Sequence, residues 1–318
     1  MRKVLSVLML LLGTALGVQG ADVVHVAPWD LHSSFWVSLH QTLIDDATRE
    51  TARDLKGFTD AERTAWGEAV AAYRAAGGKG ELTFAKPMQI TSDALSQVAD
   101  DAPDPVIDAP LSDALKRAAP VYRAHGWAED DRAARFFISY AAGLLRDAGP
   151  ELVRAHEKVY GAAWPEHIAL YVTPHAGPYG AYTMKGLSGG WITTMSCRDA
   201  GYQGFRALEM VLHESSHAIV GPNNGRVAEA IAAAGKKRGL DRPPHDLWHA
   251  ILFSTSSELT RRALVARGVV DFVPSSEDLF TRAWPFYRKP VEDGWLPYLD
   301  GRGTLEDAID KVVAGIKR

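Results

Sequence analysis

The chain has 318 residues, of which 47% are hydrophobic and 23% charged, a composition typical of a globular protein with a buried core. Its formal net charge is −4, so no basic surplus indicates nucleic-acid binding, and charges of both signs are mixed along the sequence. Cys197 is the only cysteine, which excludes an internal disulfide and leaves the hydrophobic core to stabilise the fold.

The first twenty residues differ from the rest of the chain. Two basic residues precede an apolar run, Val4–Leu12, which is too short to span a bilayer. Residues 18–20, Val-Gln-Gly, follow at the positions that a signal peptidase reads, which predicts cleavage before Ala21. Residues 1–20 are therefore predicted to be a signal peptide, with a membrane anchor as the alternative. The mature chain is expected to be periplasmic or secreted, without a stable membrane span.

Residues 21–160 are predicted to form a helical region that packs on the catalytic half of the chain. An irregular lead-in is expected over 21–30, a short extended piece at 82–84 and a loop at 100–110. A Thr-x-x-Glu capping box at Thr59 starts one helix, and Gly149-Pro150 is expected to break another. The helices are expected over 31–54, 59–76, 91–99, 111–124, 128–147 and 151–160. His32 and His40 lie on one side of the first of these helices and are interpreted as core or surface residues in preference to site residues.

The sequence pattern changes from helical to strand-like at Trp164-Pro165. Residues 161–318 are predicted to form the metal-binding region. Residues 167–173 alternate in the manner of a strand, and 181–184 with 191–195 are predicted to form a hairpin across a glycine-rich turn. Downstream helices are expected over 226–237, 243–266, 276–287 and 304–317, with a loop at 295–301. The sequence thus predicts an α+β, mainly α-helical fold: a helical N-terminal half, a small β-sheet and a helical catalytic half.

Residues 207–220 are predicted to be a helix that carries the motif His-Glu-Ser-Ser-His. His213 and His217 are four residues apart on one helix face, and could hold Zn²⁺ at about 2.0–2.1 Å per Zn–N bond. Glu214 points roughly 100° around the helix from His213, beside a metal-bound water whose proton it would take as general base. Glu209, one turn earlier, is expected to accept the second ring N–H of a ligating histidine.

A sheet, an H-E-x-x-H helix and a further helix with a third ligand together resemble the zincin metallopeptidases. The resemblance covers residues 167–265. It implies a zinc-dependent hydrolase, with His213 and His217 as metal ligands and Glu214 as general base. It also implies that residues 180–183 form the edge strand along which a peptide substrate aligns.

The third metal ligand has three candidates in the sequence. The metzincin pattern is excluded, because it needs a glycine and a histidine where this chain has Val220 and Asn223. A gluzincin-like site takes a glutamate from a later helix, here Glu229 or Glu258, and His249 is the third candidate. His249 and Glu258 are about half a turn out of phase, so a straight helix cannot aim both at one metal. His249 is favoured, because an imidazole among apolar residues needs a polar partner; a core histidine bonded to backbone is the alternative.

The leading hypothesis is an exported, zinc-dependent metallopeptidase that acts on peptides or proteins. A tetrahedral intermediate would need an oxyanion stabiliser, for which Tyr182, Tyr287 and Arg288 are candidates among which the sequence does not choose. A non-catalytic binding protein with a zincin frame is one alternative. A zinc amidase or carbohydrate-active enzyme that acts on cell-envelope material is another.

Overall fold

One mixed β-sheet lies at the centre of the molecule. The computed structural model describes residues 23–51, 53–77, 81–105 and 107–316, so the predicted signal peptide lies outside the described residues. The strands follow the order β1-β2-β3-β5-β4 across the sheet. Their bounds are β1 Val24–Val26, β2 Trp29–His32, β3 Ile168–Thr173, β4 Ala181–Lys185 and β5 Trp191–Ser196.

The sheet confirms the predicted hairpin and the predicted strand before it, and adds β1 and β2 to them. β4 and β5 pair antiparallel, with Thr183 opposite Thr193, and β3 pairs parallel with β5. The irregular lead-in expected over residues 21–30 is wrong, because this segment contains β1 and the start of β2. β2 pairs parallel with β3, so that Trp29 lies opposite Ile168. Such a distant partner leaves no local signal in the sequence, which explains the error.

Four helices and one 3-10 turn follow the first two strands. They are α1 Phe35–Thr48, α2 Asp60–Gly77, η1 Leu82–Phe84, α3 Lys86–Leu95 and α4 Ser112–His125. The capping box is confirmed: the Thr59 amide donates to Glu62 Oε2 at 2.7 Å, and the Glu62 amide donates to Thr59 Oγ1 at 3.3 Å. The extended piece expected at 82–84 is wrong, because these residues form the 3-10 turn.

The helix α5, Trp127–Tyr160, is continuous over 34 residues, although Gly149-Pro150 was expected to interrupt it. A proline inside a helix costs one hydrogen bond and some strain, about 3 kcal/mol. Leu145 and Leu152, on either side of the proline, are almost completely buried, and burying each contributes about 1.5–3 kcal/mol. Tertiary packing therefore keeps α5 continuous through Pro150. A glycine at position 149 allows the same close packing, because a Cβ there would lie 3.1 Å from the Trp29 ring.

The C-terminal half adds seven helices among the described residues. They are α6 Phe205–Ser216, α7 Gly225–Lys237, α8 Leu247–Val265, α9 Ser275–Arg282, α10 Pro285–Gly294, α11 Leu296–Leu299 and α12 Leu305–Gly315, with a 3-10 turn η2 at Ala200–Tyr202. The single helix expected over 276–287 is wrong, because Pro285 forces a break before α10. The loop expected over 295–301 contains the short helix α11, and α8 begins after the prolines at 243 and 244 rather than at them.

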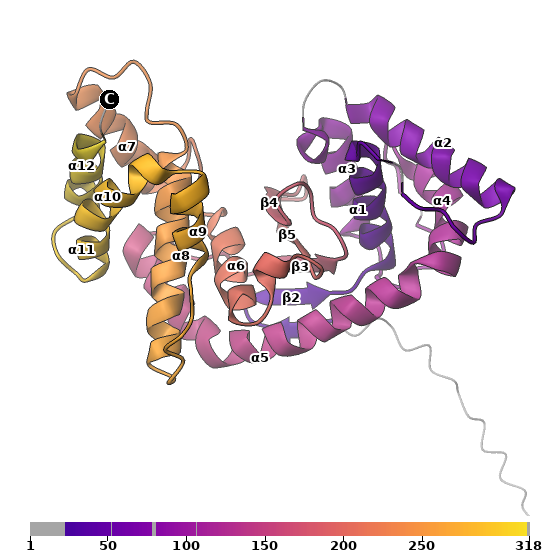
Figure 1. The fold of residues 1–318 in the computed structure, drawn as a ribbon, viewed down its shortest axis with the longest axis horizontal. Coiled ribbons are helices and arrows are strands. Elements are labelled where there is room, and N and C mark those ends of the chain that lie inside the picture. Colours follow the sequence, from indigo (N-terminus) through magenta and orange to yellow (C-terminus); the bar gives the residue numbers. More distant parts are fainter. Residues whose placement is uncertain (1–22, 52, 78–80, 106, 317–318) are drawn as a thin grey trace, which may run out of the picture.

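The predicted fold class, α+β and mainly helical, is confirmed. One hydrophobic cluster joins α1, α2 and α4 to side chains of β3, β4 and β5, and the other joins α5, α6 and α8 to the C-terminal helices. Figure 1 shows α5 running beneath the sheet from the N-terminal helices to α8. Because α5 belongs to the second cluster, the core does not divide near residue 160, where the sequence suggested a change of region. None of the described helices combines the length and apolar character that crossing a membrane requires.

Candidate metal centre

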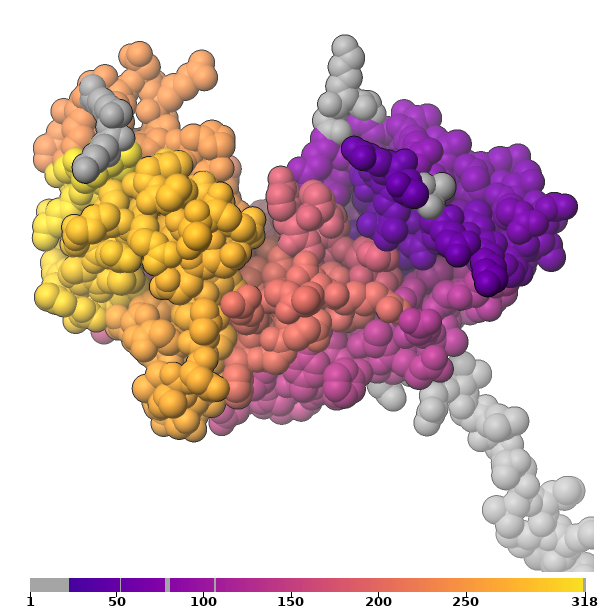
Figure 2. Space-filling model, in the orientation of Figure 1, coloured from indigo at the N-terminus to yellow at the C-terminus, as the bar shows by residue number. Residues whose placement is uncertain are grey.

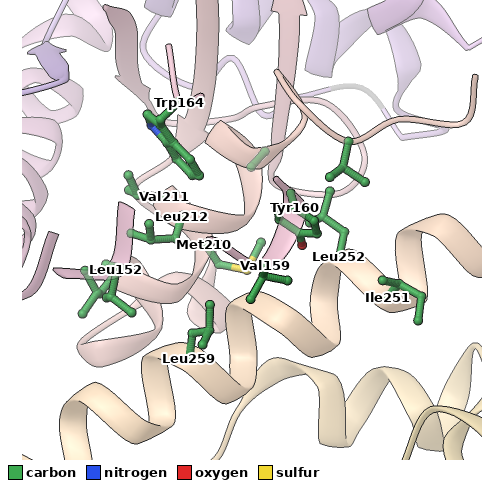
Figure 3. Close-up of a cluster of buried hydrophobic side chains, with 14 of the residues drawn as sticks. Leu152, Val159, Tyr160, Trp164, Met210, Val211, Leu212, Ile251, Leu252 and Leu259 are labelled. Atoms are coloured by element: carbon green, nitrogen blue, oxygen red, sulfur yellow. The ribbon is translucent and has the colours of Figure 1, made fainter. Parts of the chain in front are cut away.

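The helix α6 has one apolar face and one face that opens on a cavity. Its apolar side chains pack between α5 and α8, as Figure 3 shows for Val211 and Leu212 against Leu152 and Leu259. Helical periodicity places every third or fourth residue on one face, and the motif residues His213, Glu214 and His217 line the cavity. The long apolar contact fixes α6, and with it the direction of the motif side chains.

The structure brings His249 of α8 to the two histidines of α6. The three residues each offer one ring nitrogen, and these nitrogens lie within 4.8 Å of one another, in the range expected if all three share one tetrahedral metal ion. His249 Nε2 lies 3.2 Å from His213 Nε2, and two ligands of a tetrahedral ion with bonds of 2.1 Å lie about 3.4 Å apart. Among the described residues, this is the one group of three or more His, Cys, Asp or Glu residues with such spacing. The three histidines are therefore close enough to hold a metal ion.

Burial keeps these three imidazoles neutral, which is the state that binds a metal. Burial lowers the pKa of His217 to about 4, and a hydrogen bond to the main chain of Val220 partly opposes this. Burial likewise lowers the pKa of His249 to about 3, with a smaller contribution from His217. The pKa of His213 is lowered well below its usual value by burial and then by the two neighbouring histidines. The donor set thus fits a cation that accepts nitrogen ligands.

Aromatic side chains hold the three rings in place. Phe253 stacks on His213 with ring centroids 3.6 Å apart, and Trp248 stacks on His249 at 4.7 Å. Trp284 meets the His249 ring edge-on at 5.4 Å. His213 Nδ1 is buried and has no hydrogen-bond partner among the described residues, so packing on Phe253 rather than a hydrogen bond orients this ring.

Glu214 lies beside the three histidines and is held by the hairpin. Its Oε2 accepts a hydrogen bond from Thr183 Oγ1 of β4 at 3.0 Å, and this hydroxyl lies 2.9 Å from Thr193 Oγ1 of β5. The residue is 5% exposed, and burial raises the pKa of Glu214 to about 8, an effect that the Thr183 hydrogen bond reduces. Glu214 does not belong to the histidine group, as expected for a base rather than a ligand.

Glu209 has a different role from the one expected. Its carboxylate accepts hydrogen bonds from the Ser257 hydroxyl at 2.5 Å and from the Ser275 amide at 3.0 Å. The expectation that it accepts the second ring N–H of His213 is therefore wrong, because both of its oxygens are directed to α8 and to the start of α9. Glu209 instead ties α6 to these two helices, and α9 forms part of the cavity wall.

The other candidates for the third ligand lie elsewhere. Glu258 forms ion pairs of 2.7 Å with both Arg261 and Arg262. Glu229 is exposed on α7. His249 and Glu258 lie about half a turn out of phase on α8. When His249 faces α6, Glu258 therefore faces away from it.

The polar groups of the three oxyanion candidates are engaged away from the histidines. The Tyr182 hydroxyl accepts a hydrogen bond from Gln41 Nε2 at 2.7 Å, and Tyr287 donates to the His245 carbonyl at 2.5 Å. Arg288 pairs with Glu277 at 2.7 Å. The sequence did not point to Tyr202, which also lines the cavity. Its pKa is raised by burial and next by the nearby charge of Glu214, and its hydroxyl donates to the Tyr179 carbonyl. No motif marks it, so only its position in the folded chain reveals it.

A cavity of about 900 Å³ opens over the histidines and Glu214. Figure 2 shows the surface hollowed between the orange and yellow C-terminal helices and the pink segment with β4 and β5. The strand β4, the outer face of α6, the start of α8 and the helix α9 supply its wall. The cavity is large enough for several residues of a peptide or a ligand of similar size.

Comparison with known proteins adds no relative: no protein-family model, no curated protein and no solved structure matches this chain.

Proposed function

We propose that the protein is an exported zinc-dependent hydrolase, with a peptide as its substrate. The observation that carries this proposal is the convergence of three imidazole nitrogens next to a carboxylate in the wall of a large cavity. A catalytic zinc site takes three protein ligands and keeps its fourth position for water or substrate. His213, His217 and His249 supply the three ligands.

Zinc is the metal that this ligand set fits best. Three neutral imidazoles suit a borderline-soft ion without a strong geometric preference, whereas magnesium and calcium take oxygen ligands. When bound, zinc lowers the pKa of a coordinated water molecule and polarises the carbonyl group under attack. The aromatic contacts of Phe253 and Trp248 hold the ligand rings in place, so little side-chain order is lost on metal binding.

Glu214 is the general base of the proposed reaction. It accepts the proton of the attacking water and then delivers it to the leaving amine, which needs one carboxylate beside the metal. The Thr183 hydroxyl donates a hydrogen bond of 3.0 Å to one of its oxygens, and Glu214 lines the cavity. A carboxylate that is already oriented loses little conformational entropy in the transition state.

The edge strand β4 supports a peptide substrate. β4 pairs with β5 on one side and stands at the end of the strand order, and its residues 181–183 border the cavity. An extended peptide can add to such an edge through main-chain hydrogen bonds. A peptide is therefore favoured over the zinc amidase and carbohydrate-active alternatives, and export follows from the predicted signal peptide at residues 1–20.

The decisive variant is Glu214→Gln. It should bind one zinc ion per chain as the wild type does, and its hydrolysis rate should fall by about a hundredfold to ten-thousandfold, because it removes the base and keeps the ligands. Metal analysis and turnover of unfolded protein, short peptides and peptidoglycan fragments measure both effects.

Each alternative has its own outcome in this experiment. Zinc binding without turnover of any substrate supports the non-catalytic binding protein, and turnover of peptidoglycan alone supports the amidase. Hydrolysis that persists in Glu214→Gln removes Glu214 from the mechanism.

A further inference from the structure

A basic side chain lies on the same helix face as the proposed zinc ligands. Arg206, Met210, His213 and His217 follow one another at spacings of four, three and four residues, and all four line the cavity. Arg206 precedes His213 by seven residues, two turns of α6, which is about 10 Å along the helix axis at about 1.5 Å per residue. The cavity therefore extends from the histidines to this guanidinium group.

Arg206 is half-buried in the cavity wall, and its guanidinium group has no ion-pair partner among the described residues. Its Nε donates to the Val273 carbonyl at 3.3 Å. Within the described ranges, no carboxylate oxygen lies within 4.0 Å of its guanidinium nitrogens. Glu209 is close enough for the charge of Arg206 to lower its pKa, which burial raises more strongly, but its oxygens are taken by Ser257 and Ser275. The terminal nitrogens of Arg206 thus remain available to a ligand.

The other charged side chains around the cavity have local partners. Arg282 pairs with Asp278 at 2.6 Å, and Asp199 accepts a hydrogen bond from the Gly201 amide at 2.7 Å. Asp246 lies 3.1 Å from His245. Arg206 differs from Arg282 in this respect, although both are arginines of the same cavity wall. An arginine without a carboxylate partner, held by one main-chain bond, is the arrangement expected where a ligand supplies the anion.

We propose that Arg206 is a carboxylate-binding subsite, so that the preferred substrate carries a carboxylate group two or three residues from the bond that is cut. An extended peptide advances about 3.3 Å per residue. Two or three of its residues therefore span roughly the two helical turns between His213 and Arg206. The carboxylate comes either from the C-terminus of the peptide or from an acidic side chain. The inference rests on the proposed zinc-dependent hydrolase, because it places the reacting bond at the histidines.

Matched metal-binding probes test the subsite by affinity alone. We would titrate the full-length, zinc-loaded protein calorimetrically with two pairs of short peptidyl hydroxamates, whose hydroxamate group binds the zinc. The first pair differs in a C-terminal carboxylate against a carboxamide, and the second in a glutamate against a glutamine side chain. The charged member of one pair should bind about tenfold or more tightly, as hydrogen bonds between charged groups contribute on that scale. The pair that discriminates identifies the source of the carboxylate.

Three variants separate the subsite from general electrostatics. Arg206→Gln should abolish the preference, and Arg206→Lys should keep part of it, because lysine retains the charge without the two-pronged geometry. Arg282→Gln is the matched control and should retain the preference to within about twofold, because Asp278 already neutralises that arginine. Zinc content and thermal midpoint confirm that each variant is folded.

The outcomes are distinct. Equal affinity for charged and neutral probes in the wild type, or a preference that survives Arg206→Gln, overturns the subsite and leaves the zinc hydrolase intact. Failure of the zinc-loaded protein to bind any hydroxamate overturns the proposed function, and the subsite with it.

Discussion

A core histidine, His40, and the histidines of the candidate metal centre differ in the partners that their ring nitrogens face. His40, in the N-terminal cluster, has Nδ1 2.7 Å from the Tyr73 hydroxyl and Nε2 3.0 Å from the Ser92 hydroxyl. In the metal centre, His213 and His249 turn their Nε2 atoms toward each other and toward the cavity. Burial lowers the pKa of both His40 and His249 to about 3. The protonation state therefore does not separate a core histidine from a candidate ligand, whereas the partners of the ring nitrogens do.

The largest effect is expected from breaking the metal centre. His249→Ala removes one of three proposed ligands, so zinc affinity should fall by more than the roughly 10–100-fold that loss of an outer-shell partner costs. Competition with a chromophoric chelator measures this affinity. The matched change His40→Ala should leave zinc affinity as in the wild type, and equal zinc loss in both variants would contradict the contrast.

The same pair of variants should behave in the opposite way in stability. His40→Ala leaves the Tyr73 and Ser92 hydroxyls buried without this partner, and the free energy of unfolding should fall by about 3 kcal/mol. Urea unfolding of the metal-free protein measures the change. His249→Ala should cost less in the metal-free protein, because its Nε2 faces another imidazole and a cavity. An unchanged free energy of unfolding for His40→Ala would contradict a stabilising role of His40 in the core.

Thr183→Val sharpens the comparison within the site itself. Valine has the same shape but cannot donate to Glu214, so kcat should fall about tenfold to a hundredfold, as for loss of a hydrogen bond to a charged group. Zinc content should not change, because Thr183 contacts no histidine of the centre. Thr183→Ser keeps the hydroxyl and should restore most of the activity, an outcome that a purely structural role in β4 would not produce.

Over the range from pH 7 to pH 5, the smallest effect on stability is the pH dependence that His40 carries. Its pKa is about 3 in the folded protein because of burial and about 6.5 in the unfolded chain. The unfolded chain thus binds more protons between these values, so the contribution of His40 is fully present above pH 6.5. It is lost as the pH falls toward 3, by up to about 1.4 kcal/mol per pH unit. Unfolding of His40→Gln at pH 7, 6 and 5 should show a shallower loss, and parallel curves would contradict the assignment.

The sequence alone determined the elements with a short-range signal. The Thr59–Glu62 capping box and the β4–β5 hairpin formed where the pattern predicted them, because their hydrogen bonds join residues close in the chain. The motif helix formed as well, but it ends at Ser216 rather than at residue 220. The four-residue spacing also placed His213 and His217 on one helix face, since helical geometry fixes that direction. The phase of the helix that became α8 showed that His249 and Glu258 cannot both face one metal, and the apolar surroundings of His249 favoured it.

Only the tertiary structure decided the rest. The pairing of β2 with β3, the passage of α5 through Pro150 and the approach of His249 to α6 depend on contacts between residues far apart in the chain. The redirection of Glu209 to Ser275 and the free guanidinium group of Arg206 depend on the position of α9 and its preceding loop. Local patterns fix which face of a helix a side chain occupies, but packing energy, summed over distant residues, fixes what that face meets.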